Sequence, residues 1–132
     1  MSDELQERRL AVLKEFAQAW NNHDIDALMS FMSDDCVFMA SAGDEATGKR
    51  FEGYEEVKAG YQKIWEIFPD AAWNEDQHFV AGDRGVSEWR FTGTTADGAF
   101  VNTHGNDLFV FREDKIYIKD SYRKNSPPTP KS

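Results

Sequence analysis

Asp107 has the surroundings that acid–base chemistry requires. It lies within the mostly apolar stretch Asn106-Asp107-Leu108-Phe109-Val110-Phe111. If this stretch is a strand, alternation places Asp107 on the same face as Phe109 and Phe111. Aromatic neighbours solvate a carboxylate poorly, which raises its pKa and suits it to donating or accepting a proton. The alternative is that Asp107 and Asn106 are solvated residues at the entry of a strand.

The last apolar segment offers a second pair of candidates, Asp120 and Tyr122. Alternation predicts that both side chains share a face with Ile116, where an Asp–Tyr pair can bind or protonate a carbonyl oxygen. A shift of one residue turns every side chain of a strand to the other face. In that register, Lys119 and Ser121 take their place.

Two histidines, His78 and His104, lie in the predicted strands, and imidazole is a ready base near neutral pH. His104 is three residues from Asp107, so an unbroken strand puts them on opposite faces. A bulge at Gly105 would change this. The alternative for each histidine is a structural role.

The composition limits the kinds of partner. The chain has 132 residues, the size of one domain, and 40% of them are hydrophobic, enough for one core. Its formal net charge of −9 repels phosphate backbones and anionic membranes. The single cysteine, Cys36, cannot form an internal disulfide and is expected to be a small core residue. We expect neither a nucleic acid nor a membrane as partner.

Localisation and cofactors follow from motifs that the sequence lacks. The acidic N-terminus has no apolar signal segment, and no apolar run reaches the roughly 20 residues that span a bilayer. There is no His-x-His, His-Glu-x-x-His or paired-cysteine spacing and no glycine-rich phosphate loop. We therefore expect a cytoplasmic protein with no metal and no cofactor.

Three helices are predicted in the first half of the chain. The first spans about residues 3–21, where apolar residues recur at steps of three or four. A short second helix follows the predicted N-cap Asp24 and is expected to end at residues 33–35. Its inner face carries Leu28, Phe31 and Met32. The third spans about residues 54–68 and ends before Pro69.

Strands dominate the rest of the chain. Residues 36–40 predict a short buried strand, and residues 41–53 a loop or irregular hairpin. Further strands are predicted near 71–81, 85–95, 99–112 and 115–124. The dipeptides between them, Gly82-Asp83, Asp97-Gly98 and Glu113-Asp114, predict consecutive hairpins. Helices followed by a meander indicate one α+β domain over residues 1–124, with helices on the concave face of a curved, mainly antiparallel sheet and a flexible tail at 125–132.

Aromatic residues from these helices and strands are predicted to line a cavity under the helices. They are Phe16, Trp20, Tyr61, Trp65, Trp89, Phe91 and Phe109, with Trp73 nearby. The alternative is plain core packing. Together they exceed what a tight core of this length requires, which favours a cavity for a flat, hydrophobic ligand.

The order of elements resembles the nuclear transport factor 2 superfamily over about residues 8–124. The local patterns that carry the resemblance are Phe16–Leu28, Ser33–Phe38, Trp89–Thr94 and Phe109–Ile116. The most similar branch is that of the SnoaL-like polyketide cyclases and ketosteroid-isomerase-like proteins. This superfamily implies a cone-shaped α+β fold that hosts enzymes, binding modules and transport factors.

The resemblance also implies which catalytic positions are kept. Ketosteroid isomerases place an Asp base after the first strand, where this chain has Met39 and Ala40, and a Tyr donor where it has Phe16. Their protonated Asp matches Asp107. Limonene epoxide hydrolase has a last-strand Asp that resembles Asp120, and the Asp of SnoaL-like cyclases corresponds to one of these two. Steroid isomerisation by the isomerase mechanism is therefore not expected.

Two functions remain open. The first is cofactor-free isomerisation, cyclisation or hydration of a small hydrophobic or polycyclic molecule. The second is a non-catalytic binding or dimerisation module of the same fold. Leu108 and Val110 alternate with Asp107, so the outer face of the sheet is also apolar. Because members of this family commonly pair through that face, we expect a homodimer.

Overall fold

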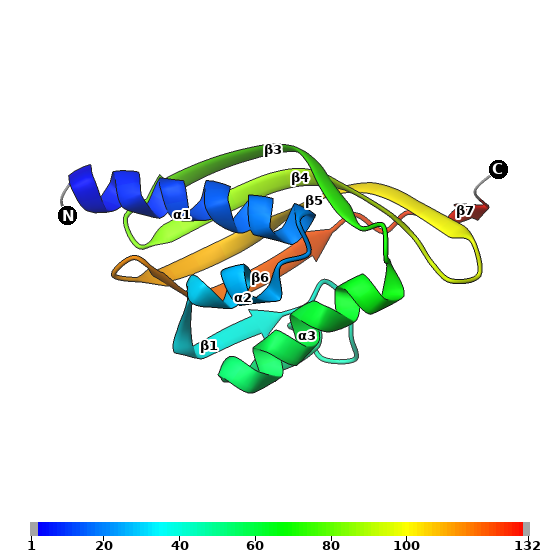
Figure 1. The fold of residues 1–132 in the computed structure, drawn as a ribbon, viewed down its shortest axis with the longest axis horizontal. Helices are drawn as coiled ribbons and strands as arrows, with labels where there is room; N and C mark the ends of the chain where they lie inside the picture. Colours follow the sequence, from blue (N-terminus) through cyan, green and yellow to red (C-terminus); the bar gives the residue numbers. More distant parts are fainter. Residues whose placement is uncertain (1–2, 131–132) are drawn as a thin grey trace.

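A computed structural model describes residues 3–130, which form helices on one side of a curved sheet (Figure 1). The elements are α1 (Asp3–Asn21), α2 (Ile25–Ser30), β1 (Met32–Met39), β2 (Arg50–Glu52), α3 (Tyr54–Ile67), β3 (Ala72–Ala81), β4 (Arg84–Thr94), β5 (Ala99–Arg112), β6 (Lys115–Arg123) and β7 (Thr129–Pro130). The sheet order is β2-β1-β6-β5-β4-β3, and β7 pairs with β5. Only the β1–β6 pair is parallel among these strands. The predicted α+β class is confirmed.

Helix α1 buries one stripe against the sheet, as its spacing predicts. The buried residues are Arg9, Val12, Leu13, Phe16, Ala19 and Trp20. Arg9 is 3% exposed, and its guanidinium donates to the carbonyl oxygens of Gly82 and Glu113, each at 2.7 Å. These two carbonyls belong to the turns after β3 and β5, so the charged residue in the stripe fixes the helix to both hairpins.

The second helix is shorter than the sequence predicts. Asp24 is the predicted N-cap, and its Oδ1 accepts from the Ala27 amide at 3.1 Å. The helix ends at Ser30, and Met32 already pairs with Ile116 of β6. Strand pairing overrides the local polarity of residues 33–35, which lie within β1 rather than ending a helix.

The predicted meander forms with its turns at the expected dipeptides. β3 ends at Ala81 and β4 begins at Arg84, with Gly82 at φ 62°, a conformation that glycine adopts without strain. Within the segment predicted to be a tail, Thr129 pairs with Phe100 of β5 and Pro130 with Ala99. The remainder of the predicted tail, residues 131–132, and the first two residues lie outside the described part of the chain.

A bulge in the β5–β6 hairpin decides which side chains face the interior. Val110 pairs with Ile118, whereas the next residue, Phe111, pairs with Ile116. Tyr117 is therefore an extra residue, and Ile116 and Ile118 lie on opposite faces of the sheet. Every residue of β6 after the bulge faces the side opposite to the one that unbroken alternation from Ile116 predicts.

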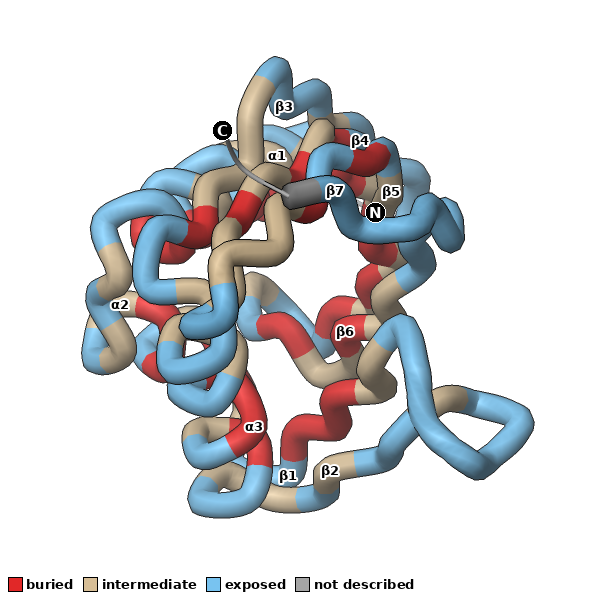
Figure 2. The backbone as a smooth tube through the Cα atoms, turned by 90° about the vertical axis from the view of Figure 1, so that its right-hand side faces the viewer, coloured by how far each residue is buried: buried red, intermediate tan, exposed pale blue. Residues whose placement is uncertain are grey.

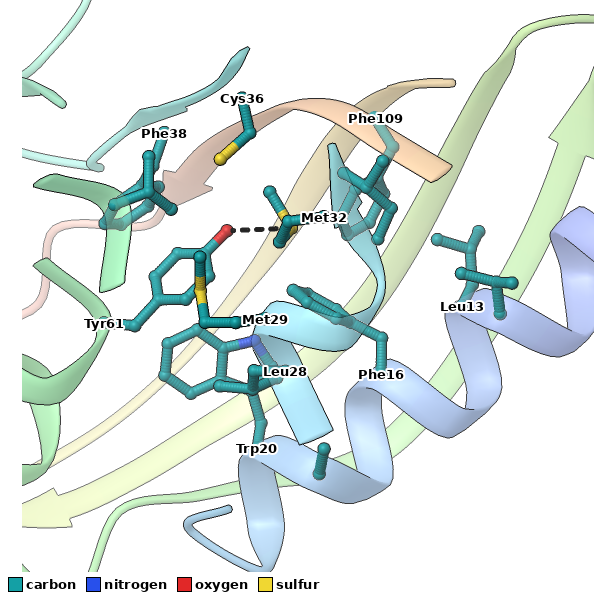
Figure 3. Packing of buried hydrophobic residues seen from close by; sticks show 14 of the residues in the cluster. Leu13, Phe16, Trp20, Leu28, Met29, Met32, Cys36, Phe38, Tyr61 and Phe109 are labelled. Atoms are coloured by element: carbon teal, nitrogen blue, oxygen red, sulfur yellow. Dashed lines mark hydrogen bonds between the residues drawn. The ribbon is translucent and has the colours of Figure 1, made fainter. Parts of the chain in front are cut away.

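The core lies between the helices and the inner face of the sheet, where buried residues line both layers (Figures 2 and 3). Aromatic rings pack around Trp20, edge to face for Tyr61 and Trp65 and tilted for Trp73. Its ring centroid is 4.8 Å from that of Tyr61, 4.9 Å from Trp73 and 5.3 Å from Trp65. Burial raises the pKa of Tyr61 well above its usual value. Within residues 3–130, no helix has the length and apolar character needed to cross a membrane.

Candidate active site

Asp107 lies on the inner face with Phe109 and Phe111, as alternation predicts, and it is ion-paired with Lys119 of β6. The Lys119 ammonium is 3.2 Å from Asp107 Oδ1, and the two side chains are 6% and 9% exposed. Two further donors reach the same carboxylate: Trp89 Nε1 at 3.0 Å from Oδ2 and Ser121 Oγ at 2.6 Å from Oδ1. Three donors therefore reach one carboxyl group, and each of its two oxygens accepts at least one hydrogen bond.

Lys119 is surrounded by aromatic rings as well as by Asp107. Its ammonium nitrogen is 4.6 Å from the ring centroid of Phe38, 5.2 Å from Trp20 and 5.6 Å from Tyr61. It also donates to Ser121 Oγ at 2.7 Å. Burial lowers the pKa of Lys119, and the neighbouring Asp107 carboxylate opposes this effect. The result is a buried ammonium held in place by one counter-ion and several ring faces.

A small interior cavity adjoins this ion pair. Its volume is about 20 Å³, which is room for one water molecule. Its polar walls are Asp76, Ser87, Asp107 and Lys119. Its apolar walls are Leu13, Phe16, Ala17, Trp20, Trp73, Trp89 and Phe109. The cavity is much smaller than the hollow expected for a flat ligand, because the aromatic rings pack against one another and the Asp107–Lys119 pair fills the space below them.

Some of the aromatic residues predicted to line the cavity do so. Phe16, Trp20, Trp89 and Phe109 form part of its wall. Tyr61 packs behind Trp20, Phe91 belongs to a second cluster with Ala71, Trp89 and Val101, and Trp65 stacks on His23 at 5.1 Å. These last three rings support the wall instead of forming it.

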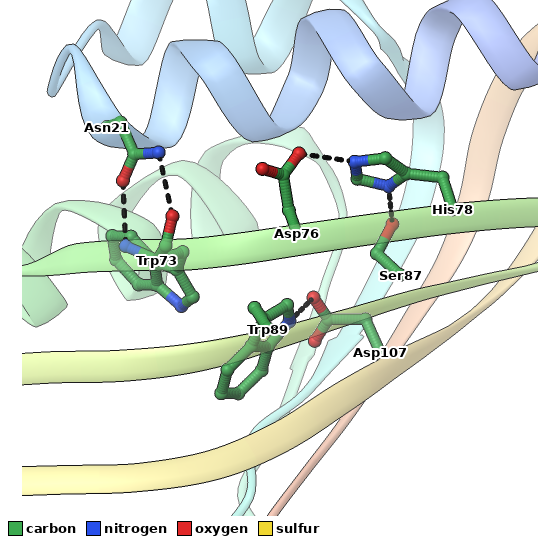
Figure 4. A network of polar contacts seen from close by, with 7 residues as sticks. All are labelled: Asn21, Trp73, Asp76, His78, Ser87, Trp89 and Asp107. Carbon is green, nitrogen blue, oxygen red and sulfur yellow. Dashed lines mark hydrogen bonds and ion pairs between the residues drawn. The ribbon is translucent and has the colours of Figure 1, made fainter.

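His78 lies in a second polar group, next to the first (Figure 4). Its Nε2 is 2.6 Å from Asp76 Oδ2, and its Nδ1 is 2.7 Å from Ser87 Oγ. The His78 side chain is only 3% exposed, whereas that of Asp76 is 42% exposed. His78 therefore joins two residues of the cavity wall, Asp76, which is also open to solvent, and Ser87.

Asp120 and Tyr122 lie on the outer face, so the predicted orientation of this pair is wrong. Asp120 is paired with Leu108 and Tyr122 with Asn106, and neither partner shares the face of Asp107. The Tyr122 hydroxyl donates to Asp120 Oδ2 at 3.1 Å, and the Tyr122 residue is 52% exposed. The extra residue in β6 is the cause, because it brings Lys119 and Ser121 to the inner face instead.

His104 also lies on the outer face and is exposed, paired across the strands with Arg90. It borders a groove of about 680 Å³ that crosses the outer face between Ser41 and β3. Arg90 in this groove is ion-paired with Glu75 at 2.5 Å. His104, Glu75 and Glu88 of this groove are exposed, so they lack the desolvation that acid–base chemistry requires.

Sequence reasoning missed Asp76 and Ser87, and offered Lys119 and Ser121 only as the other register of the last strand. Alternation along β4 puts Ser87 on the face of Trp89 and Phe91, so a signal for Ser87 was present. Asp76 gave none, since it lies within the irregularity between Asn74 and Gln77, which breaks the strand's alternation.

These features define a helix-covered, curved-sheet protein with a buried carboxylate–ammonium pair beside an interior cavity. The sequence profile of the SnoaL-like domain matches residues 13–118. The chain therefore belongs to the SnoaL-like domain family. No protein of curated function matches it by sequence.

Solved structures agree on the fold. An NTF2-like protein of unknown function from Mesorhizobium loti has 25% sequence identity and a TM-score of 0.76, covering 95% of this chain and 98% of its own. A cystatin-like-fold protein from Xanthomonas campestris has 19% identity and a TM-score of 0.77, covering 89% and 91%. A hypothetical protein with a ketosteroid isomerase-like fold from Catenulispora acidiphila, in complex with trimethylamine, has 19% identity and a TM-score of 0.72, covering 84% and 83%.

Proposed function

We propose that this protein binds a small hydrophobic carbonyl compound and moves a proton on it without a cofactor, with Asp107 as the base. The observation that carries the proposal is the Asp107–Lys119 pair, almost fully buried at a cavity. A buried ion pair rarely stabilises a fold more than apolar residues of the same volume would, because both charges lose their hydration. A pair kept in such a place therefore points to chemistry.

The step needs one base and one positive charge, and the site holds both. The Asp107 carboxylate takes a proton from the carbon next to the carbonyl group. The C–H bond breaks, an O–H bond forms on Asp107, and the electron pair moves to the carbonyl oxygen, giving an enolate. The Lys119 ammonium stabilises the developing negative charge in surroundings of low dielectric constant. Return of the proton to the same or another carbon completes an exchange or an isomerisation.

A substrate larger than water requires movement of the aromatic wall. Trp73 is the aromatic wall residue on the edge strand β3 and is only partly buried. Its displacement would enlarge the cavity without disturbing the ion pair. The aromatic cluster also holds two buried indole donors, of Trp20 and Trp65, with no acceptor among the described residues. A ligand oxygen that reached either one would satisfy it.

Deuterium exchange tests this function. Cyclohexanone and 2-tetralone in D2O, followed by ¹H NMR, should lose the signal of the protons next to the carbonyl faster with the protein than without it. Asp107→Asn should lower the protein-dependent rate by about 100-fold or more, the usual effect of removing a general base. Asp120→Asn, on the outer face, is the matched control and should keep the wild-type rate. An Asp107→Asn variant that folds and exchanges at the wild-type rate contradicts the assignment.

We further propose that two copies associate through the outer face of the sheet. Apolar side chains of four strands lie together there: Phe79, Val86, Leu108, Val110 and Ile118. Phe79 is 55% exposed, which is unfavourable for a face left in water. Sedimentation velocity should give a dimer for the wild type and a monomer for Phe79→Lys. A monomeric wild type at tens of micromolar would contradict the pairing.

A further inference from the structure

One row of polar residues crosses the inner face of the sheet. His78 of β3 is the strand partner of Ser87, Ser87 that of Asp107, and Asp107 that of Ser121. Partners in neighbouring strands share a face, so all of these side chains point towards the helices. One adjacent row consists of Val80, Gly85 and Phe109 and ends in Lys119 of β6. The row therefore links the edge strand to the Asp107–Lys119 pair through an apolar layer.

The hydrogen bonds fix the direction in which a proton can pass. A carboxylate only accepts, so the contact with Asp76 places the proton of a neutral imidazole on Nε2 of His78. Nδ1 is then an acceptor, and the Ser87 hydroxyl donates to it. The Ser87 hydroxyl thus lies between the Nδ1 lone pair to which it donates and the cavity that Asp107 lines.

After Asp107 has taken a proton, it needs a second group to which it can pass that proton. Its neutral form leaves the Lys119 ammonium buried without a counter-ion, in a place where burial already lowers the pKa of Lys119. Passing the proton on restores the ion pair. The cavity has room for one water molecule to join Asp107 to Ser87.

We propose that His78 is a second acid–base group, which stores the proton taken by Asp107 and receives it through Ser87. The proton leaves Asp107 for the water in the cavity, a water proton passes to Ser87 Oγ, and the Ser87 hydroxyl proton passes to Nδ1 of His78. His78 becomes an imidazolium, with Asp76 as its counter-ion, and returns the proton by the same path. No electrons leave or enter, and each group regains its starting form.

The groups around His78 support this role. On β3 it faces Asp76, on β4 Ser87, and across the cavity lie Asp107 of β5 and Lys119 of β6. Helix α1 packs over β3 and adds only apolar side chains to the cavity wall: Leu13, Phe16, Ala17 and Trp20. Asp76 is the one member of the chain open to solvent, so it also allows His78 to exchange protons with water.

This inference rests on the proposed function, and ketone exchange in D2O tests both. The wild-type rate should show an inflection with pH, because only a neutral His78 can receive the proton. Ser87→Ala should lower the rate on the order of 10-fold and remove the inflection, whereas Ser87→Thr, which keeps the hydroxyl, should retain both. His78→Gln should behave as Ser87→Ala does. His104→Gln, a histidine on the outer face, is the control and should change neither.

The outcomes separate the two proposals. If the wild type catalyses exchange and Ser87→Ala does so at the same rate, the relay is contradicted and Asp107 remains the proposed base. If neither ketone exchanges with the wild type, the proposed function fails, and ¹⁵N NMR of histidine-labelled protein decides the relay. It should show neutral His78 protonated on Nε2, with an Nδ1 signal that moves in Ser87→Ala and not in Ser87→Thr. A proton on Nδ1 overturns the relay.

Discussion

Lys119→Met should lower the free energy of unfolding by about 3–5 kcal/mol, the usual cost of leaving one member of a buried ion pair alone. The Asp107 side chain is 9% exposed and would keep only two donors, Trp89 and Ser121. Methionine fills the space of the lysine stem among the rings of Trp20, Phe38 and Tyr61, so the loss is electrostatic rather than a cavity effect. Urea denaturation at pH 8 measures it.

The double variant isolates the cause. Asp107→Asn combined with Lys119→Met removes both charges and keeps an oxygen for the Trp89 indole, so most of the lost stability should return. Arg8→Met breaks an exposed ion pair with Asp114 and should cost no more than about 1 kcal/mol. A Lys119→Met protein as stable as Arg8→Met would show that the pair is not buried.

Gly105→Ala should destabilise the protein by about 3 kcal/mol, at the upper end of the usual cost of overpacking. A Cβ atom on Gly105 would lie 2.4 Å from the carbonyl oxygen of Tyr122 and 2.6 Å from the indole of Trp89. The indole that rests on this glycine is the one that donates to Asp107. The substitution therefore pushes Trp89 off the sheet and takes a donor from the carboxylate.

Two measurements check this expectation. Urea denaturation gives the loss of stability, and tryptophan fluorescence of the folded variant reports the displaced indole. Gly98→Ala is the control, since Gly98 has φ 87° in a turn and open space around it. It should cost about 1 kcal/mol from backbone strain and leave the fluorescence unchanged. Equal costs for the two substitutions would mean that the Trp89 indole does not pack on Gly105.

The sequence predicted the elements better than the orientations. Turn dipeptides and helical spacing located the helices and the meander, because those signals are local. The facing of Asp107 also followed from alternation, since β5 is regular around it. The facing of Asp120 did not, because the bulge opposite Val110 and Phe111 depends on how two strands fit together.

The size of the cavity and the partner of Asp107 were equally beyond the sequence. The number of aromatic residues does not show whether the rings surround a cavity or pack against one another. Here the rings around Trp20 contact one another and leave only a small cavity. Lys119 looks like an exposed strand residue until the register places its ammonium between Phe38 and Trp20. Long-range packing therefore determines the cavity and the partner of Asp107, whereas local sequence patterns determine only the helices and strands that carry them.

The parallel pairing of β1 with β6 has a consequence for biosynthesis. Val37 pairs with Ile118, so a strand made early waits for almost the last strand of the chain. Until β6 emerges from the ribosome, the edge of β1 that pairs with β6 has no strand partner. The nascent chain then exposes an aggregation-prone strand edge. Contacts of such large sequence separation also make folding slow. Production of this protein should therefore benefit from slower translation or added chaperones.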